Sequence, residues 1–346
     1  MSSLSCGACG YHVFLEAQSC ANCGRALAFH WPSLGFVVLP EDGQTTVEVD
    51  GRTWSPCARW DWHCNWLAGD DDESPRCLSC RLTRRRPESD DTLALELLAE
   101  ASIAKRRLVV QLLELGLPIT AYYEREGGLA FDMISSRSGN EKVIIGHANG
   151  VITIDLAETL DAHREALRVS LGEPYRTMLG HLRHEVGHYY QGVLVDTDER
   201  WAECRRLFGD ERASYQDAIA RHYSEGAPEG WVTSYISEYA TMHPWEDFAE
   251  TFAHYLHITG TLATAARTGL TLHAERVQTN VSTDVVPRTS YADSDMPTML
   301  WDWYWLSQMF NRVNQSMGQR DLYPFAITTP VAEKLAFLHE LVTAAR

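Results

Sequence analysis

The stretch LGHLRHEVGHYYQGVLV, residues 179–195, contains the pattern His-Glu-Val-Gly-His at positions 184–188. His184 and His188 are four residues apart, so on a helix both imidazoles lie on one face, with Glu185 beside them. Two neutral imidazoles and a nearby carboxylate suit metal-assisted hydrolysis, because the metal lowers the pKa of a water and the carboxylate takes its proton. The pattern therefore predicts a catalytic zinc site, provided that a third ligand lies elsewhere in the chain.

The third ligand of such a site is not supplied by the residues that directly follow the second histidine. In one class of zinc peptidases, Gly stands three residues after the second His, and another His follows three residues later. Here those places hold Gln191 and Leu194, so we expect a ligand from a different helix.

The segment HPWEDFAETFAHYLHI, residues 243–258, provides the best candidate for that ligand. Glu246 and Glu250 are four residues apart and share one face of a helix. In zinc peptidases with a separate glutamate ligand, a carboxylate four residues later braces a ligand histidine. We therefore expect Glu246 to bind zinc and Glu250 to accept a hydrogen bond from one of the two histidines, with His254 as the alternative third ligand.

Eight of the nine cysteines lie in the first 80 residues, which indicates either disulfides or bound metal. Two Cys-x-x-Cys-Gly repeats contain Cys6, Cys9, Cys20 and Cys23. This spacing lets both thiolates of a pair reach one tetrahedral ion, and the glycine relieves the turn. We predict a structural zinc site with four cysteine ligands here, whereas Cys204 has no partner in sequence and is expected to be an inert core thiol.

A second set of cysteines comprises Cys57, Cys64, Cys77 and Cys80, of which only the last two have the spacing of a standard pair. A cysteine-rich module of this size has little hydrophobic core and needs a further cross-link, such as a bound metal ion, for stability. We therefore predict a second structural zinc ion on these four thiolates, with His63 as the alternative to the neighbouring cysteine.

The composition is that of an ordinary globular protein, with 346 residues, 45% apolar residues and a formal net charge of −17. Neither an 18-residue apolar run nor a signal peptide is evident, so we expect no membrane span and a cytoplasmic location. An acidic surface repels phosphate backbones, which makes nucleic acid an unexpected partner. The basic cluster RLTRRR, residues 81–86, is interpreted as a solvated linker.

The pattern of apolar residues changes after Pro87, which places a domain boundary there: a zinc-ribbon module over residues 1–88 and a second domain over residues 89–346. The second domain begins with a helix over residues 92–116. Three strand-like runs follow, at residues 128–136, 141–148 and 151–157, with a hairpin signal at Asn149-Gly150. Helical patterns then occupy residues 157–172, 173–195, 200–209, 214–226, 244–260, 297–318 and 330–346. We predict an α+β domain in which a small antiparallel sheet precedes many helices.

The strand VITIDLA, residues 151–157, comes just before the helices. In zinc peptidases of this kind, an exposed sheet edge pairs with an extended peptide through main-chain hydrogen bonds. We expect this strand to be that edge, and the alternative is an interior strand, which its apolar side chains would also suit.

These motifs resemble those of a bacterial family of zinc-binding metallopeptidases with an N-terminal zinc ribbon, which is similar to the gluzincins. The resemblance covers nearly the whole chain and includes HEVGH, PWEDFAETFAHYLHI, CNWL, CLSCRLTRRRP, RLFGDERASY and MGQRDLYPFAIT. It implies a zincin-like metallopeptidase domain, and it does not indicate a particular substrate.

The segment before Glu246 also resembles that of the lethal-factor type of zinc protease, in which a tyrosine stands seven residues before the glutamate ligand. Tyr239 occupies that place here. The resemblance implies that its hydroxyl stabilises the oxyanion of the tetrahedral intermediate, with Tyr235 and His243 as alternatives.

Taken together, the sequence predicts a zinc-dependent peptidase with one catalytic and two structural zinc ions, acting on a peptide or protein substrate. Glu185 would assist the attack of a zinc-bound water on the peptide carbonyl and return the proton to the leaving amine. The rival hypothesis is a non-catalytic zinc-binding module that recognises peptide or nucleic acid.

Overall fold

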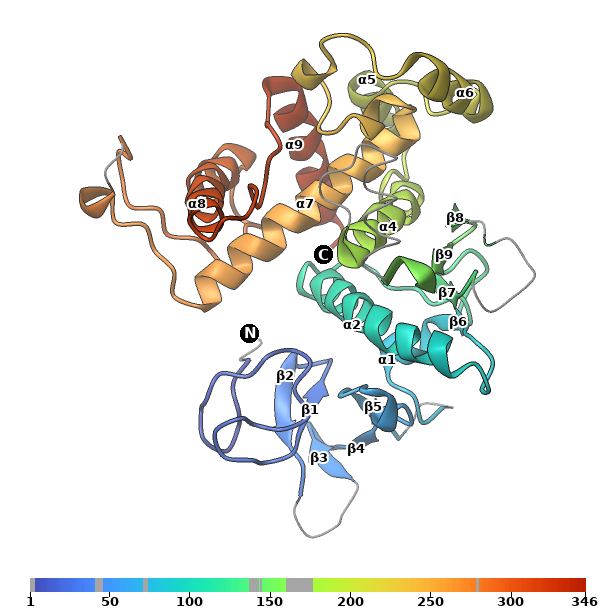
Figure 1. Cartoon of the computed structure of the whole chain (residues 1–346), viewed down its shortest axis with the longest axis vertical. Coiled ribbons are helices and arrows are strands. Elements are labelled where there is room, and N and C mark those ends of the chain that lie inside the picture. The colour runs from blue at the N-terminus through green and yellow to red at the C-terminus, as the bar shows by residue number, and fades with distance from the viewer. Residues whose placement is uncertain are drawn as a thin grey trace. The chain divides into compact units, whose positions relative to one another are not determined.

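The computed structural model describes residues 4–40, 46–70, 74–136, 143, 145–159, 177–277 and 280–346. Contacts divide the chain into two compact units (Figure 1). The N-terminal unit comprises residues 1–114 and 119–163, and the C-terminal unit comprises residues 115–118 and 164–346. Among the described residues, no helix is both long enough and apolar enough to cross a membrane.

The cysteine-rich part of the N-terminal unit contains two small antiparallel sheets around separate apolar clusters. The first sheet consists of β1 (Leu27–His30) and β2 (Gly35–Val38). The second consists of β3 (Val47–Val49), β4 (Arg52–Pro56) and β5 (Leu67–Gly69). The short helices η1 (Trp60–Trp62) and α1 (Leu78–Arg81) follow in the same region. Cores this small leave much of the stability to the cysteine sites.

The third sheet has the strand order β6-β7-β9-β8. Its strands are β6 (Thr83–Arg85), β7 (Ala130–Ile134), β8 (Gly146–Ala148) and β9 (Val151–Asp155). The hairpin at Asn149-Gly150 is confirmed: Ala148 pairs with Val151, and both turn residues have positive φ angles of 47° and 81°.

The expectation of an antiparallel sheet is wrong, because β6 and β7 are parallel, as are β7 and β9, while β8 is antiparallel to β9. The long helix α2 (Thr92–Glu114), which the sequence predicts, connects β6 to β7 as a crossover, and such a connection brings the chain back in the same direction. The expectation that residues 151–157 form a sheet edge is also wrong. Strand β9 lies between β7 and β8, so its main chain is paired on both sides, and Ile152 and Ile154 are buried.

The C-terminal unit consists mainly of helices, as the sequence predicts. They are α4 (Met178–Leu194), α5 (Asp198–Phe208), α6 (Tyr215–Glu225), α7 (Pro244–Arg267), α8 (Met296–Ser316) and α9 (Thr329–Ala344). Helix α7 contacts α4, α5, α8 and α9, and Figure 1 shows it running beside α4. Of the helix expected over residues 157–172, the first three residues belong to η2 (Leu156–Thr159) and the remainder lies outside the described residues.

Side-chain caps and buried contacts position α4 and α7. The Thr177 hydroxyl accepts a hydrogen bond from the backbone N–H of Gly180 and thereby begins α4. Along α7, Phe248 and Phe252 are fully buried, and the Phe252 ring stacks on Tyr190 of α4. The ammonium group of Lys334, on α9, lies 2.6 Å from the Asp247 carboxylate in the interior, which joins α9 to the first turn of α7. Both helices that carry the conspicuous histidines and glutamates are therefore embedded in the core of this unit.

Candidate metal centres

Helices α4 and α7 bring His184, His188 and Glu246 together in the C-terminal unit. The Glu246 Oε2 atom lies 2.9 Å from His184 Nε2 and 3.3 Å from His188 Nε2. One ligand atom from each residue lies within 4.8 Å of the other two. The Glu246 side chain is 2% exposed, so its carboxylate is buried against two imidazoles. A buried carboxylate between two imidazoles suits a divalent cation with nitrogen and oxygen ligands, which is the ligand preference of zinc.

The electrostatic balance at these three residues also favours a cation. Burial alone would lower the pKa of His184, but its hydrogen bonds to Glu246 and Glu250 outweigh burial and raise the pKa well above the usual range. Burial alone would raise the pKa of Glu246, but the two histidines outweigh that effect and lower it. Positive charge is thus stabilised between these groups, which is what a bound Zn²⁺ would supply.

Gly187 lets α4 approach α7 closely enough to assemble this group. A Cβ atom at Gly187 would lie 2.9 Å from the Cα atom of Ala249 and 3.2 Å from the Cβ atom of Phe252. Real Cβ atoms do not come so close to backbone, so only glycine permits this helix separation. The glycine in HEVGH therefore lets the two histidines and Glu246 come together, although it contributes no side chain to the group.

We expect the substitution Gly187→Ala to push the two helices apart. The zinc affinity of the histidine–glutamate site should fall by about tenfold or more, because ligand geometry tolerates only small displacements. The added methyl group should also destabilise the fold by about 1–3 kcal/mol. Gly192→Ala on the same helix is the matched control, since a Cβ there meets nothing within 4 Å. Zinc titration of both variants measures the affinity, and thermal unfolding measures the stability. A Gly187→Ala protein with native zinc affinity and stability would contradict the prediction.

Glu250 braces one of the two histidines. Its Oε1 atom lies 2.6 Å from His184 Nδ1, and its Oε2 atom accepts a hydrogen bond of 2.6 Å from the Ser237 hydroxyl. A carboxylate at Nδ1 keeps the proton on that nitrogen and leaves the Nε2 lone pair of His184 for a metal. The structure thus selects His184 as the partner of Glu250, and it adds Ser237, which sequence reasoning missed because a lone serine carries no spacing signal.

Glu185 has the position expected of a proton acceptor. Its side chain is 8% exposed, and Oε1 lies 3.2 Å from His181 Nε2. The Oε2 atom is buried and has no hydrogen-bond partner among the described residues. Burial alone would raise the pKa of Glu185, but the contact with His181 and the nearby His184 outweigh it and lower the pKa to about 2. A buried carboxylate oxygen without a partner is costly, so it indicates a functional role.

Two tyrosines lie next to His184 and Glu246. Tyr239, on η4 (Tyr239–Thr241), has its ring centroid 5.8 Å from that of His184. Tyr215, the first residue of α6, donates a hydrogen bond of 2.7 Å from its hydroxyl to Glu246 Oε1. Burial is the main cause that raises the pKa of both tyrosines, so both hydroxyls keep their protons at neutral pH. Sequence reasoning missed Tyr215, because it lies 31 residues from Glu246 and matches no motif.

The alternative third ligand, His254, is not part of this group. Its Nδ1 atom lies 2.8 Å from the Tyr323 hydroxyl, and its ring packs against Phe325 at a centroid distance of 4.4 Å. Burial lowers the pKa of His254 to about 4, so it is neutral in this aromatic environment. His254 therefore belongs to the packing between α7 and the segment before α9.

The two alternatives to Tyr239 also have other partners. The Tyr235 ring lies under the Lys334 ammonium group at 4.4 Å. His243 caps α7, because its Nδ1 atom accepts a hydrogen bond of 3.1 Å from the backbone N–H of Trp245. Among these three candidates, only Tyr239 has its ring packed against a histidine of the group.

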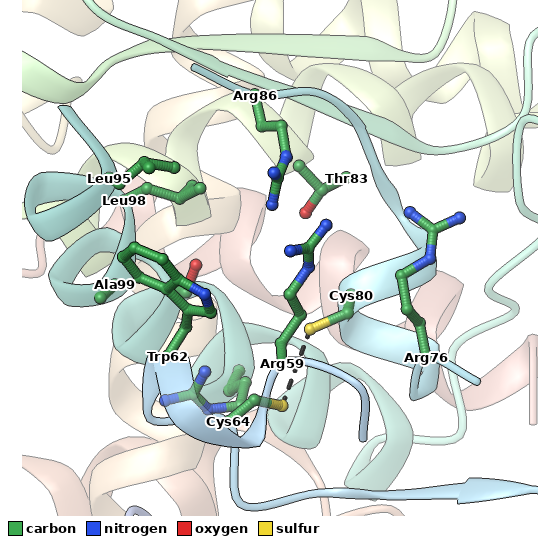
Figure 2. A pocket seen from close by; sticks show the side chains of 12 residues that line it. Arg59, Trp62, Cys64, Arg76, Cys80, Thr83, Arg86, Leu95, Leu98 and Ala99 are labelled. Atoms are coloured by element: carbon green, nitrogen blue, oxygen red, sulfur yellow. Dashed lines mark hydrogen bonds between the residues drawn. The ribbon is translucent and has the colours of Figure 1, made fainter. Parts of the chain in front are cut away.

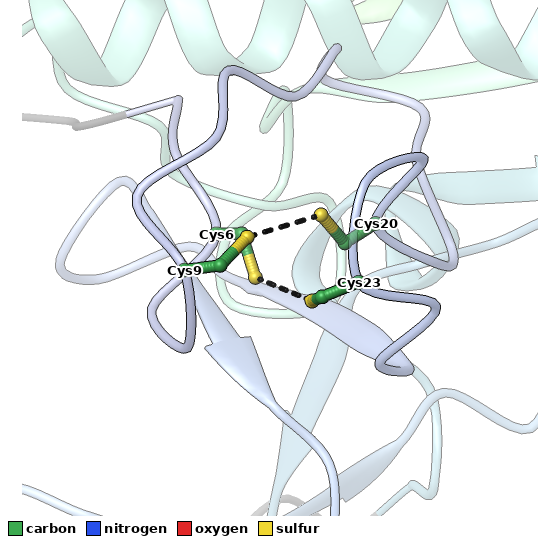
Figure 3. Close-up of side chains that lie close together, drawn as sticks. All are labelled: Cys6, Cys9, Cys20 and Cys23. Carbon is green, nitrogen blue, oxygen red and sulfur yellow. Dashed lines mark hydrogen bonds between the residues drawn. The ribbon is translucent and has the colours of Figure 1, made fainter.

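In the N-terminal unit, the first cysteine cluster consists of Cys6, Cys9, Cys20 and Cys23 (Figure 3). Cys6 Sγ lies 3.7 Å from Cys23 Sγ, and Cys9 Sγ lies 3.6 Å from Cys20 Sγ. A disulfide would bring two sulfurs to about 2.05 Å. Four thiolates about 2.3 Å from a tetrahedral Zn²⁺ are separated by about 3.8 Å, close to the distances observed. The following glycines adopt positive φ angles, 71° at Gly10, as the knuckle turn requires.

The second cysteine cluster consists of Cys57, Cys64, Cys77 and Cys80. Cys64 Sγ lies 3.6 Å from the Sγ atoms of both Cys77 and Cys80, and Cys57 Sγ accepts a hydrogen bond from the backbone N–H of Cys77. The alternative ligand, His63, has an exposed side chain and is absent from this described group. Both clusters offer four sulfur atoms at distances that fit a tetrahedral zinc ion.

The ninth cysteine, Cys204, lies outside both clusters on α5. Its thiol is buried and accepts a hydrogen bond from the Gln191 amide. Burial raises its pKa to about 12, so the group is a neutral thiol at physiological pH. This environment agrees with the expectation of an inert core thiol.

Comparison with known proteins agrees with these centres. Residues 94–341 match the family described as "Putative zinc-binding metallo-peptidase", and residues 3–91 match a zinc-ribbon domain. Relatives described as uncharacterized proteins, one from Mycobacterium bovis and two from strains of Mycobacterium tuberculosis, are each 42% identical over 345 residues. These alignments cover 99% of this chain and 95% of each relative. No solved structure matches the chain. With its histidine–glutamate group in the region of the first match and its cysteine clusters in that of the second, this chain belongs to the zinc-binding metallo-peptidase family and carries an N-terminal zinc-ribbon domain.

Proposed function

We propose that this protein is a peptidase of the gluzincin type, with zinc held by His184, His188 and Glu246 in a zincin-like domain. One observation carries the proposal. Glu185, between the two histidines in sequence, is an ionised, buried carboxylate with one oxygen that has no hydrogen-bond partner among the described residues. A site that only stores zinc has no use for such a group, whereas hydrolysis needs a base beside the ligands.

Glu185, Tyr239 and a bound zinc ion would each have a separate role in hydrolysis. A bound zinc ion would polarise the peptide carbonyl and make a water molecule more acidic. Glu185 accepts a proton as the water oxygen attacks the carbonyl carbon, and it then delivers that proton to the amine as the C–N bond breaks. The Tyr239 hydroxyl, whose burial keeps it protonated, donates a hydrogen bond to the developing oxyanion.

The remaining polar residues hold the ligands in place. Glu250, fixed by Ser237, orients the His184 ring, and Tyr215 holds the second oxygen of Glu246. Ligands supported in this way lose little freedom when a metal binds, which favours affinity and a constant geometry. Support of both His184 and Glu246 by neighbouring side chains is the arrangement of a built site rather than of a chance cluster.

The two cysteine clusters complete the proposal, each with a structural zinc ion closed by four thiolates. The zinc-ribbon module would then comprise residues 1–88, and the peptidase domain residues 89–346. Free thiols in such number persist in a reducing compartment, so we place the protein in the cytoplasm. Peptides or proteins are its substrates, and the net charge of −17 disfavours nucleic acid as the main partner.

Zinc content and peptide cleavage of the full chain test the proposal. The native protein should contain about three zinc ions and cleave members of a mixed peptide library, with products read by mass spectrometry. The His184→Ala, His188→Ala double variant should contain about two zinc ions and cleave none. His273→Ala, which changes an exposed histidine, is the control and should behave as native. Three zinc ions without cleavage of any peptide would favour the rival reading, a zinc-binding module that recognises its partner without hydrolysis.

A further inference from the structure

A pocket in the N-terminal unit has no part in the proposed peptide hydrolysis. It encloses about 540 Å³, counted together with the open solvent at its mouth, and lies against the second cysteine cluster (Figure 2). Four arginines from separate segments of the chain line it, namely Arg59, Arg76, Arg86 and Arg106. Because this volume includes open solvent, only the inner part of the pocket, between the arginines, is enclosed.

The carboxylate of Glu88 acts on Arg86, but it does not line the pocket. Among the described residues that line the pocket there is no Asp or Glu. The partners of two of these side chains are neutral: Arg76 donates to the Ser74 hydroxyl, and Arg106 donates to the backbone carbonyl of His63. Guanidinium groups gathered in one concave site without a carboxylate repel one another, so the site is suited to an anion.

The arrangement of two of these arginines is shown in Figure 2, where the guanidinium groups of Arg59 and Arg86 point toward one another and toward Thr83. Burial lowers the pKa of Arg86, the charges of Arg59 and Arg76 lower it further, and Glu88 offsets only part of this effect, so three like charges lie near one another. An oxyanion placed between Arg59 and Arg86 would relieve this repulsion and could accept hydrogen bonds from both.

The second cysteine cluster offsets only part of the positive charge. Four thiolates on Zn²⁺ carry about two net negative charges. The buried ammonium group of Lys105, which hydrogen-bonds to the Thr83 hydroxyl, adds a fifth positive group to the four arginines. Positive charge is therefore in excess even with zinc bound.

One wall of the pocket is apolar. The Trp62 side chain, 41% exposed, lies beside Leu95, Leu98 and Ala99 of α2 (Figure 2). An indole with a free face can stack on a flat ring, and guanidinium groups match phosphate oxygens in geometry. The chain as a whole is strongly acidic, with a net charge of −17, so a long polyanion would be repelled where a small one would not.

We propose that this pocket binds a phosphate ester of the size of a mononucleotide, with its phosphate between Arg59 and Arg86 and its ring against Trp62. The site lies in the N-terminal unit, where α2 packs against the second cysteine cluster. The proposal stands independently of the peptidase activity.

Isothermal titration calorimetry of the full, zinc-loaded chain tests the site, with ADP, inorganic pyrophosphate and adenosine as probes. ADP should bind with a Kd below about 1 mM, pyrophosphate more weakly, and adenosine not measurably. The Arg59→Gln, Arg86→Gln double variant should lose about tenfold or more in ADP affinity, because charged hydrogen bonds to phosphate are lost. Zinc analysis of each variant establishes that the second cysteine cluster remains intact.

Arg85→Gln is the matched control, since Arg85 is exposed in the same basic run and does not line the pocket. Its ADP affinity should stay within about twofold of native. Trp62→Leu should weaken the binding of ADP and leave the affinity for pyrophosphate unchanged. An equal loss of affinity for both probes would show that the indole does not contact the ring of the ligand. Absence of ADP binding, or equal ADP affinity in the native chain and the double arginine variant, would overturn the site. Binding of a single-stranded oligonucleotide without any binding of ADP would assign the arginines to nucleic acid and would overturn it too.

Discussion

Replacing Glu185 with Gln should lower the rate of peptide cleavage by about 10²–10⁴-fold, the usual contribution of a general base. The amide has nearly the shape of the carboxylate and can still accept a hydrogen bond from His181, but it cannot take a proton from water. Glu185 is not one of the three proposed ligands, so zinc content should remain at about three ions. Kinetics with an identified peptide, together with elemental analysis, measure both quantities.

The same substitution should lower the thermal midpoint at neutral pH. Burial disfavours the ionised form of Glu185, but the nearby histidines stabilise it more strongly, so the fold lowers the pKa of Glu185 to about 2, and a neutral amide loses that interaction. Glu199→Gln, on the exposed start of α5, is the control and should alter neither cleavage nor zinc. Undiminished turnover in Glu185→Gln would rule out Glu185 as the base and would leave the assignment of the zinc ligands intact.

The second large effect is expected from the Cys64→Ser, Cys77→Ser double variant. Zinc content should fall by about one ion, and the segment around β3, β4, β5 and α1 should lose its fixed structure. The reason is that the apolar core of this segment is small, whereas structural zinc contributes about 10–16 kcal/mol in zinc-finger peptides near pH 7. Loss of the near-ultraviolet circular dichroism of buried Trp54 and faster amide hydrogen exchange over residues 46–86 would report the change.

Cys204→Ser distinguishes this effect from the general cost of replacing a buried thiol. Cys204 is as buried as Cys64, but it lies outside both clusters, so its replacement should change neither zinc content nor exchange over residues 46–86. If the double variant kept three zinc ions and native exchange, the second cysteine cluster would not be a metal site.

The parts of the candidate site that depend on local geometry could be predicted from the sequence. Histidines four residues apart share a helix face whatever the helix packs against, and cysteines three residues apart form a turn that can hold one ion. Glu246 is 62 residues from His184, and it was predicted because it has a regular spacing to Glu250 and a resemblance to known peptidases. In each of these cases the signal lies within a few neighbouring residues.

The parts that the sequence did not predict depend on residues that are distant in the chain and follow no spacing. Tyr215 and Ser237 are single polar residues whose roles appear only when their hydroxyls meet Glu246 and Glu250. The run at residues 81–86 was interpreted as a solvated linker, yet Arg86 from this run lines a pocket with Arg59. The prediction of an antiparallel sheet was wrong for a similar reason. The direction of a strand depends on the path of the crossover through α2 and not on the pattern within each strand.

The sequence by itself therefore determined which side chains are candidate metal ligands, the helical content and the arrangement of the cysteine pairs, because these follow from short-range periodicity and spacing. Only the tertiary structure decided which histidine Glu250 braces, why HEVGH needs Gly187, and where β9 lies in its sheet. Each of these depends on which surfaces pack together, such as the approach of Gly187 to Ala249, and that is set by the burial of the whole core rather than by any one segment.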